Sequence, residues 1–229
     1  MRVAIIPAKG ISKRIQRKNI KNFCGKPLIS YPLLELKKTD IFNRVIVSTD
    51  DDEIAEIAKE YGAEVPFIRP SNLSDDMTGT SKVIAHAIQE VDRDNKIEYV
   101  CCVYPTTPML NIDDIENACH QLVNSEKSFV FSATQYSYPA ERAFYLDENN
   151  EVKMLFPKNY EKRSQDLKNV YHDAGQFYWG TKQAWLDNEL IFGDKSSPHI
   201  LPHYRVQDID TEDDWKRAEQ IYLSTNETK

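Results

Sequence analysis

Residues 3–19 read Val-Ala-Ile-Ile-Pro-Ala-Lys-Gly-Ile-Ser-Lys-Arg-Ile-Gln-Arg-Lys-Asn, an apolar run followed by a basic loop. The run at 3–6 is too short for a core helix and predicts a buried first strand. Five cationic side chains then fall within ten residues: Lys9, Lys13, Arg14, Arg17 and Lys18. Gly10 and Ser12 lie among them, and small residues let backbone N–H groups approach an anion closely.

A solvated basic turn is the alternative interpretation of this loop, and composition alone does not separate the two. Position favours an anion site, because ligands of open α/β sheets bind at the carboxyl ends of the strands. Triphosphate is an anion that calls for this much positive charge in one place. The loop therefore predicts a nucleotide site.

The composition indicates one ordinary globular domain. The chain has 229 residues, 41% hydrophobic and 28% charged, which suits a sizeable core. The net charge of −7 argues against a nucleic-acid partner. No apolar run reaches membrane-spanning length, and the start lacks the apolar region of a signal peptide, so we expect no membrane partner. The four cysteines have no metal-ligand spacing and favour a reduced, cytoplasmic setting.

Apolar runs alternate with helical patterns through the first half of the chain, which predicts an α/β fold with a mostly parallel sheet and helices on both faces. We expect strands at 3–6, 44–48, 65–68, 99–104 and 129–133. We expect helices at 27–38, 54–61, 84–91 and 115–122, from the spacing of their apolar residues. Cys101 and Cys102, as neighbours in a strand, should point to opposite faces.

The alternation ends near Gln135. Residues 143–146 and 152–156 flank Asp-Glu-Asn-Asn at 147–150, which is a hairpin signal. An insertion of about 135–170 is therefore expected, as a lid, a disordered loop or an oligomer contact. Residues 170–180 return to the core, and a final helix begins at Thr211 with Asp214 completing a capping box.

Asp208-Ile209-Asp210 is the second informative motif. In extended chain, alternate residues share a face, so both carboxylates can meet one hard cation. Magnesium prefers a few carboxylates together with substrate phosphates. The alternative is that both aspartates simply precede an acidic helix terminus, where the helix dipole stabilises negative charge.

The loop at 8–19 resembles the signature of the CMP-sialic acid synthetases, a family of cytidylyltransferases whose loop usually reads Ala-Arg-Gly-Gly-Ser-Lys-Arg-Ile-Pro-Arg-Lys-Asn. Here Lys9 replaces the usual Arg, Ile11 the second Gly and Gln16 the Pro. Lys lacks the bidentate fork that Arg offers to phosphate. Asp-Ile-Asp-Thr at 208–211 is similar to the family's metal motif. Tyr-His-Asp-Ala-Gly-Gln-Phe-Tyr-Trp at 171–179 is most similar to the branch that uses pseudaminic acid.

The resemblance covers almost the whole chain and implies a fold, a reaction and an assembly. The fold would be a Rossmann-like nucleotidyltransferase sheet in a single cytidylyltransferase domain over 1–229, with the 135–170 insertion as a protruding element of a homodimer. The reaction would transfer CMP from CTP to the anomeric hydroxyl of an acidic nine-carbon sugar and release pyrophosphate, with Mg²⁺ as cofactor. Pseudaminic acid would be the sugar, with N-acetylneuraminic acid the alternative.

The resemblance also implies roles for individual residues. Lys9 and Lys18 would be catalytic, near the α-phosphate, and Lys13 would bind the outer phosphates. The nucleotide-binding residues would be Ala8, Lys9, Gly10, Ser12, Lys13, Lys18, Asn19, Arg69, Thr78, Gly79 and Thr80. The substrate-binding residues would be Tyr104, Arg142, Arg163, His172, Asp173 and Gln176. The two arginines would reach the sugar carboxylate, either within one chain or from a partner subunit. Asp208 and Asp210 would hold Mg²⁺.

Several residues keep a second interpretation. Asp50 is expected to cap a helix, although it could assist the nucleotide site, and Thr80 is expected at an N-cap position. The His172-Asp173 pair could act as a general base, but no Ser or Cys nucleophile signature accompanies it. A glycosyltransferase, or a non-catalytic nucleotide-sensing module, would be the alternative function.

Overall fold

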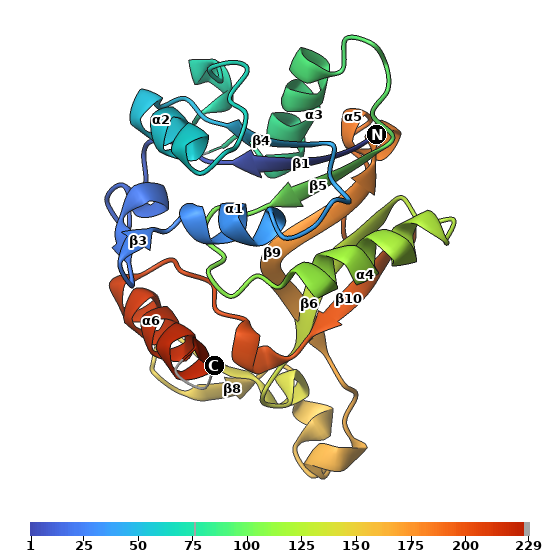
Figure 1. Cartoon of the computed structure of the whole chain (residues 1–229). Helices are drawn as coiled ribbons and strands as arrows, with labels where there is room; N and C mark the ends of the chain where they lie inside the picture. The colour runs from blue at the N-terminus through green and yellow to red at the C-terminus, as the bar shows by residue number, and fades with distance from the viewer. Residues whose placement is uncertain (76, 227–229) are drawn as a thin grey trace.

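The computed structural model describes residues 1–75 and 77–226 (Figure 1). A six-stranded sheet runs through its centre in the order β10-β6-β9-β5-β1-β4. The strands are β1 Arg2–Pro7, β4 Arg44–Ser48, β5 Tyr99–Val103, β6 Phe129–Gln135, β9 Tyr171–Thr181 and β10 Ser196–Leu201. β9 is antiparallel to both of its neighbours, and the other strands share one direction. The predicted mostly parallel sheet is confirmed.

Helices cover both faces of this sheet, as predicted. α1 Ser30–Leu36, α2 Asp52–Glu60 and α4 Ile112–Val123 pack on one face, and α3 Thr80–Val91 and α5 Lys182–Leu186 on the other (Figure 1). Because both faces are covered, the buried strands read as continuous apolar runs, and Val3 to Ile6 are all fully buried. Cys101 belongs to the cluster of one face and Cys102 to that of the other, which confirms their expected alternation.

A smaller third cluster brings residues 15–31 and 209–218 together. The last helix, α6 Glu212–Asn226, packs its Trp215 edge-on against Phe23 of the short strand β2 Asn22–Phe23, which pairs with β3 Lys26–Pro27. Ile15 of the basic loop and Ile209 of the Asp-Ile-Asp motif are buried in the same cluster. Thr211 and Asp214 form the predicted capping box, each donating its backbone N–H to the other's side chain. The first and last motifs of the sequence are thereby held side by side.

Three expectations about elements are wrong. Residues 65–68 form no strand: isolated bridges pair Glu64 with Ile46 of β4 and Ile68 with Thr49, just after β4. The helix expected at 27–38 begins at Ser30, because Pro27 pairs in β3. The N-cap of α3 is Gly79 rather than Thr80, whose hydroxyl instead contacts Tyr104.

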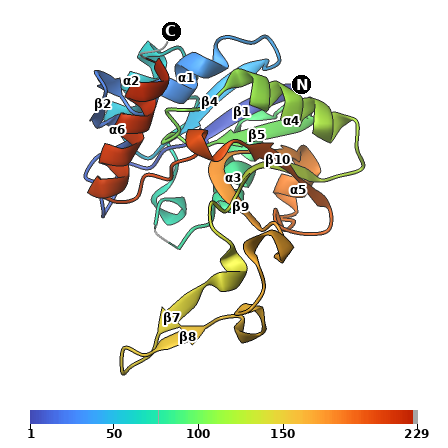
Figure 2. The same ribbon diagram turned by 90° about the horizontal axis from the view of Figure 1, so that it is seen from below.

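The insertion projects away from the sheet (Figure 2). It carries the predicted hairpin as β7 Phe144–Leu146 and β8 Val152–Met154, closed by a turn in which Asp147 accepts backbone N–H groups. Short 3₁₀ helices complete the fold: Lys18–Ile20, Ser71–Leu73, Ala140–Arg142, Pro157–Asn159, Ser164–Asp166 and His203–Arg205. None of the helices within the described residues is long and apolar enough to cross a bilayer.

Candidate functional site

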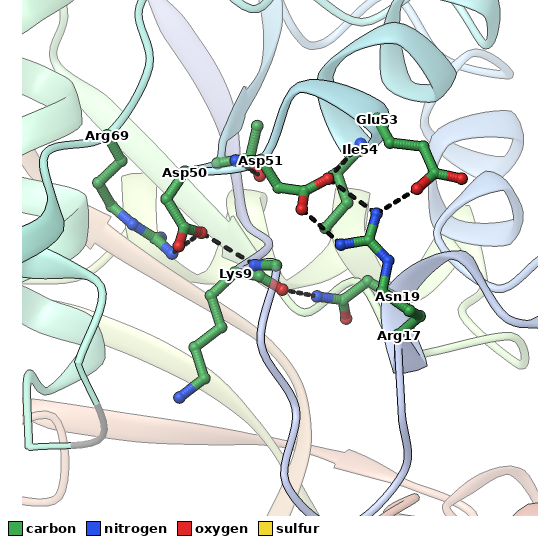
Figure 3. A network of polar contacts seen from close by, with 10 residues as sticks. Lys9, Arg17, Asn19, Asp50, Asp51, Glu53, Ile54 and Arg69 are labelled. Carbon is green, nitrogen blue, oxygen red and sulfur yellow. Dashed lines mark hydrogen bonds and ion pairs between the residues drawn. The ribbon is translucent and has the colours of Figure 1, made fainter.

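The basic loop is fastened at its start to the turn between β4 and α2 (Figure 3). The Gly10 N–H donates to Oδ1 of Asp50 at 2.9 Å. A Cβ at Gly10 would lie 2.6 Å from Oδ2 of Asp51, so only glycine allows this approach. Asn19 closes the loop by donating its side-chain amide to the Lys9 carbonyl at 2.9 Å.

The far end of the loop is fastened by Arg17. This residue has a φ of 54°, in the left-handed region that few non-glycine residues adopt. Its guanidinium binds both carboxylate oxygens of Asp51 and, at 2.5 Å, Oε2 of Glu53 (Figure 3). The hydrogen bond from Arg17 lowers the pKa of Asp51, and that same bond raises the pKa of Arg17. Arg17 is therefore an anchor of the loop.

A cavity of about 620 Å³ opens beside the loop. The other loop cations line it: Lys9, Lys13, Arg14 and Lys18. Figure 3 shows the Lys9 side chain extending away from the carboxylates of Asp50 and Asp51. The predicted nucleotide residues that line the cavity are Lys9, Ser12, Lys13, Lys18, Asn19, Arg69, Thr78 and Thr80. A dense cluster of positive charge thus faces one cavity of small-molecule size.

Three predicted nucleotide residues support the cavity from behind. Ala8 is fully buried, and its backbone N–H donates to the Ser48 carbonyl at 2.9 Å. Gly10 is held by Asp50, and Gly79 caps α3. Arg14 lines the cavity although no role was predicted for it, and its position among the loop cations is the signal that could have found it.

Arg69 also lines the cavity and is only 4% exposed. Its guanidinium donates to the Ser48 carbonyl at 3.2 Å, to the Ser74 hydroxyl at 3.1 Å and to Asp50 at 3.4 Å. Burial lowers the pKa of Arg69, and the charge of Asp50 opposes that change. Asp50 is not the helix cap that the sequence favoured, because the cap of α2 is Asp51, which accepts from the Ile54 N–H at 3.0 Å.

The Asp-Ile-Asp motif lies against the loop. Lys18 Nζ donates to the Ile209 carbonyl at 2.6 Å and lies 3.4 Å from Oδ1 of Asp210, which Arg14 also contacts at 2.8 Å. Ile209 is fully buried between its neighbours. Desolvation, and then the negative charge of Asp210, raises the pKa of Asp208. The two carboxylates are therefore close enough to repel each other, as expected for residues that share a face.

Two neighbouring carboxylates that repel each other are a suitable half-site for a hard divalent cation. Among the described residues, no group of three or more acidic, histidine or cysteine side chains is placed to hold a metal ion. Two carboxylates are the kind of donor set that Mg²⁺ uses when it shares its coordination with substrate phosphates, so Asp208 and Asp210 fit such a cation.

A second cavity, of about 460 Å³, adjoins the first. Tyr104 lines both cavities, and its hydroxyl is 2.9 Å from that of Thr80. The remaining lining residues are His172, Asp173, Ala174, Gly175, Tyr178, Val206, Gln207 and Asp208. Burial raises the pKa of Tyr104 to about 12, so its hydroxyl is protonated at neutral pH.

Polar groups of β9 shape the second cavity. The Tyr178 hydroxyl donates to Oδ2 of Asp173 at 2.5 Å, and the Gly175 N–H donates to Oδ1 at 2.9 Å. Nδ1 of His172 lies 2.8 Å from the backbone carbonyl of Asp173 rather than from its carboxylate. The carboxylate of Asp173 is therefore hydrogen-bonded to Tyr178, a residue for which the sequence predicted no role. It does not pair with the His172 ring, so the structure does not form the His172–Asp173 general-base pair.

Three predicted substrate residues lie outside both cavities in this single chain. Gln176 is buried, and its amide donates to the Arg205 carbonyl at 2.7 Å. Arg142 donates to the Lys162 carbonyl within the insertion, and Arg163 pairs with Asp166 at 3.2 Å. Gln176 supports the segment before Asp208, whereas the two arginines belong to the projecting arm.

A further support of that segment was missed by sequence reasoning. Asp114 on α4 accepts from Arg205 at 2.5 Å and lies 3.2 Å from Nε2 of His199 on β10. The hydrogen bonds from His199 and Arg205 lower the pKa of Asp114 although burial opposes them. These residues are 85 and 91 positions from Asp114, which is why no local pattern indicates the contact.

Known proteins are similar to this chain in sequence and in fold. Residues 3–225 match the model of the cytidylyltransferase family. Pseudaminic acid cytidylyltransferases from Campylobacter jejuni serotypes O:2 and O:23/36 are 47% and 45% identical over 227 residues, which cover 99% of this chain and 98% of each relative. The solved structure of CMP:2-keto-3-deoxy-manno-octonic acid synthetase complexed with CTP has the same fold, with a TM-score of 0.71, 13% identity, and coverage of 98% of this chain and 99% of that one. The chain belongs to the cytidylyltransferase family.

Proposed function

We propose that this chain transfers CMP from CTP to the anomeric hydroxyl of a nonulosonic acid, and that pseudaminic acid is the sugar. One observation carries the proposal: Lys18 and Arg14 line the larger cavity and contact Asp210, two residues from Asp208, which lines the smaller cavity. The names of the Campylobacter relatives, at 47% and 45% identity over nearly the whole chain, support the same reaction.

The larger cavity suits the nucleotide. Lys9, Lys13 and Lys18 line it and bring the positive charge that a triphosphate requires. Arg69 and the hydroxyls of Thr78 and Thr80, which also line it, offer hydrogen bonds to a base and a ribose. We assign CTP to this cavity, with its α-phosphate nearest Lys18.

The smaller cavity suits the sugar. Asp208 lines it and Lys18 lines its neighbour, so a sugar hydroxyl at the junction would be placed for in-line attack on the α-phosphate. The step needs no covalent enzyme intermediate. Lys18 and Lys9 would neutralise charge on the equatorial oxygens as it develops, and Lys13 would stabilise the departing pyrophosphate.

We assign Mg²⁺ to Asp208 and Asp210. When bound there with phosphate oxygens, the ion would neutralise phosphate charge and lower the pKa of the attacking hydroxyl. Arg14 and Lys18 balance the charge of Asp210 in the absence of a cation.

Tyr104 and Asp173 favour pseudaminic acid over N-acetylneuraminic acid. Pseudaminic acid ends in a deoxy methyl group, which packs well on the flat face of Tyr104, whereas the hydroxylated tail of N-acetylneuraminic acid would lose hydrogen bonds there. Pseudaminic acid also bears a second acylamino group, whose N–H could donate to the carboxylate of Asp173.

We also propose that the chain acts as a homodimer in the cytoplasm, where CTP is available. The projecting hairpin exposes apolar side chains that a symmetric partner would cover, among them Phe144, Leu146, Leu155 and Phe156. A dimer formed through this arm could bring Arg142 and Arg163 to the partner's sugar cavity, where they would bind the sugar carboxylate.

Release of pyrophosphate on mixing the chain with CTP, Mg²⁺ and a sugar tests the proposal. Pseudaminic acid should support turnover with a kcat/KM far above that of N-acetylneuraminic acid. Equal values would contradict the choice of sugar and leave the reaction standing. Consumption of a nucleotide sugar would indicate a glycosyltransferase, and CTP binding without turnover on any nonulosonic acid would indicate a sensing module.

A further inference from the structure

Asp50 links two parts of the nucleotide cavity that are distant in sequence. It follows β4, and its Oδ1 accepts both the Gly10 N–H at 2.9 Å and the Arg69 guanidinium at 3.4 Å (Figure 3). One carboxylate oxygen thus touches both the start of the phosphate-binding loop and a second residue that lines the cavity, Arg69. The neighbouring Asp51 caps α2 and binds Arg17, so Asp50 is not needed for either task.

Arg69 depends on Asp50 for its charge balance. Its side chain is 3% exposed, and its other recorded partners, the Ser48 carbonyl and the Ser74 hydroxyl, are neutral. In the described part of the chain, Asp50 is the carboxylate that pairs with it. A buried guanidinium without a paired carboxylate is costly, so removal of the Asp50 charge would release Arg69 from its present position.

The position of Arg69 matters because some of its N–H donors make no hydrogen bond to the residues that the structure describes and can bind a ligand. A guanidinium has five N–H donors and no acceptor. Three of its contacts are made to protein, which leaves donors for the contents of the cavity that Arg69 lines. Cytosine offers two adjacent acceptors, O2 and N3, whereas uracil has an N–H at position 3. A donor group held against that edge therefore favours cytosine and rejects uracil.

We propose that Asp50 is a positioning residue for base selection, which holds Arg69 against the pyrimidine and ties it to the phosphate-binding loop through Gly10. The inference rests on the proposed use of CTP. A carboxylate beside a triphosphate site repels the ligand, so electrostatics alone predicts that loss of the Asp50 charge tightens nucleotide binding. Positioning predicts the opposite.

The test is calorimetric binding of CTP and of UTP to the whole chain, at fixed Mg²⁺ and without sugar. Asp50→Asn keeps an acceptor for the Gly10 N–H and removes the charge that holds Arg69. We expect the Kd for CTP to rise on the order of tenfold, as for loss of one charged hydrogen bond, and the Kd for UTP to change little. The preference for CTP over UTP should fall accordingly.

Asp52→Asn is the matched control. Asp52 is exposed in the first turn of α2, in the same acidic turn, and the substitution removes the same charge. Asp52→Asn should leave the Kd for CTP unchanged or slightly lower than that of the wild-type chain, and the preference for CTP over UTP unchanged. Equal behaviour of the two variants, or an Asp50→Asn chain that keeps its CTP affinity and preference, would refute the positioning role. A wild-type chain without preference for CTP would contradict the proposed function and this inference with it.

A double variant keeps the test valid if Asp50→Asn alone unfolds the chain. Arg69→Gln removes the buried cation, so adding Asp50→Asn leaves no unpaired charge. If Asp50 acts through Arg69, the double variant should bind CTP as Arg69→Gln does. A further loss of CTP affinity, on the order of tenfold, would show that Asp50 acts by another route and overturn the inference.

Discussion

Lys18 and Asp210 lie 192 positions apart in the chain, and Lys18 Nζ is 3.4 Å from Oδ1 of Asp210. The same amine donates to the Ile209 carbonyl at 2.6 Å. Burial of Ile15 and Ile209 in one cluster holds the two segments together. The candidate site is therefore complete only when α6 and the segment before it have packed on the N-terminal loop.

Lys18→Ala should lower kcat by about 10²-fold, as for loss of a group that stabilises transition-state charge, with a smaller rise of the KM for CTP. Steady-state kinetics with CTP varied would measure both. Lys21→Ala is the control, because Lys21 pairs with Glu212 at 2.8 Å and lines neither of the two site cavities.

Lys9→Arg should retain activity, since it restores the usual family residue. An inactive Lys9→Arg beside an active Lys18→Ala would reverse the two roles.

Asp208→Asn and Asp210→Asn should each remove nearly all Mg²⁺-dependent turnover, because a neutral amide binds a hard cation poorly. Asp208→Asn should also leave Tm unchanged or slightly higher, since the raised pKa of Asp208 means that its charge is disfavoured in the folded chain. Magnesium titrations and thermal unfolding measure the two effects. Asp213→Asn, in the first turn of α6, is the control. Near wild-type activity of both variants at limiting Mg²⁺ would exclude these ligands.

Asp51→Asn should weaken the anchor of the basic loop without removing the helix cap, because Asn caps as well as Asp. We expect a loss of about 1 kcal/mol in the free energy of unfolding at pH 7, as for a partly exposed ion pair. The folded-state pKa of Asp51 is lowered, so its contribution is present above the unfolded pKa of about 4 and is lost as pH falls through the folded value.

Urea unfolding across pH should therefore show a constant gap between wild type and Asp51→Asn from neutral pH down to about pH 5, and a narrowing gap below about pH 4. Asp52→Asn is the reference, since Asp52 lies in the same turn and Arg17 pairs with its neighbours Asp51 and Glu53. A gap that stays unchanged through pH 3 would show that the Arg17–Asp51 pair contributes nothing.

The projecting arm should form a symmetric dimer contact. Phe144→Asp should convert a dimer to a monomer in sedimentation experiments at micromolar concentration, because it places a charge in an apolar contact. Phe192→Asp is a matched control: both phenylalanines are 60% exposed, but Phe192 lies outside the insertion and packs edge-on against Phe131 of β6. A wild-type chain that is entirely monomeric would count against the dimer and against active-site sharing.

Local patterns were enough to predict the elements with strong periodicity. The apolar run at 3–6, the alternation of Cys101 and Cys102, and the capping box of Thr211 and Asp214 all depend on neighbouring residues, and the structure confirms them. Residues 65–68 share the same composition as a strand but do not pair continuously with β4, so propensity was overridden by the packing around them.

Long-range contacts could not be predicted in the same way. β9 lies antiparallel between β5 and β6, and β10 pairs with β6, so both strands pair with partners distant in sequence. The motifs found by spacing lie at the site, but the division of labour among them depends on tertiary contacts. Arg17 has the same charge as Lys18, yet the left-handed backbone at Arg17 places its guanidinium on Asp51. The family resemblance assigned a role to Lys18 and none to Arg17, but no local pattern of charge or spacing predicts that Arg17 anchors the loop.

Oxygen labelling tests the proposed CMP transfer most directly. Pseudaminic acid carrying ¹⁸O in its anomeric hydroxyl would be incubated with CTP, Mg²⁺ and the chain, and the product followed by ³¹P NMR. Attack of that oxygen on the α-phosphorus predicts an isotope-shifted CMP resonance, with one pyrophosphate released for each CMP-sugar formed. An unlabelled CMP product, or pyrophosphate released without a CMP-sugar, would contradict the account.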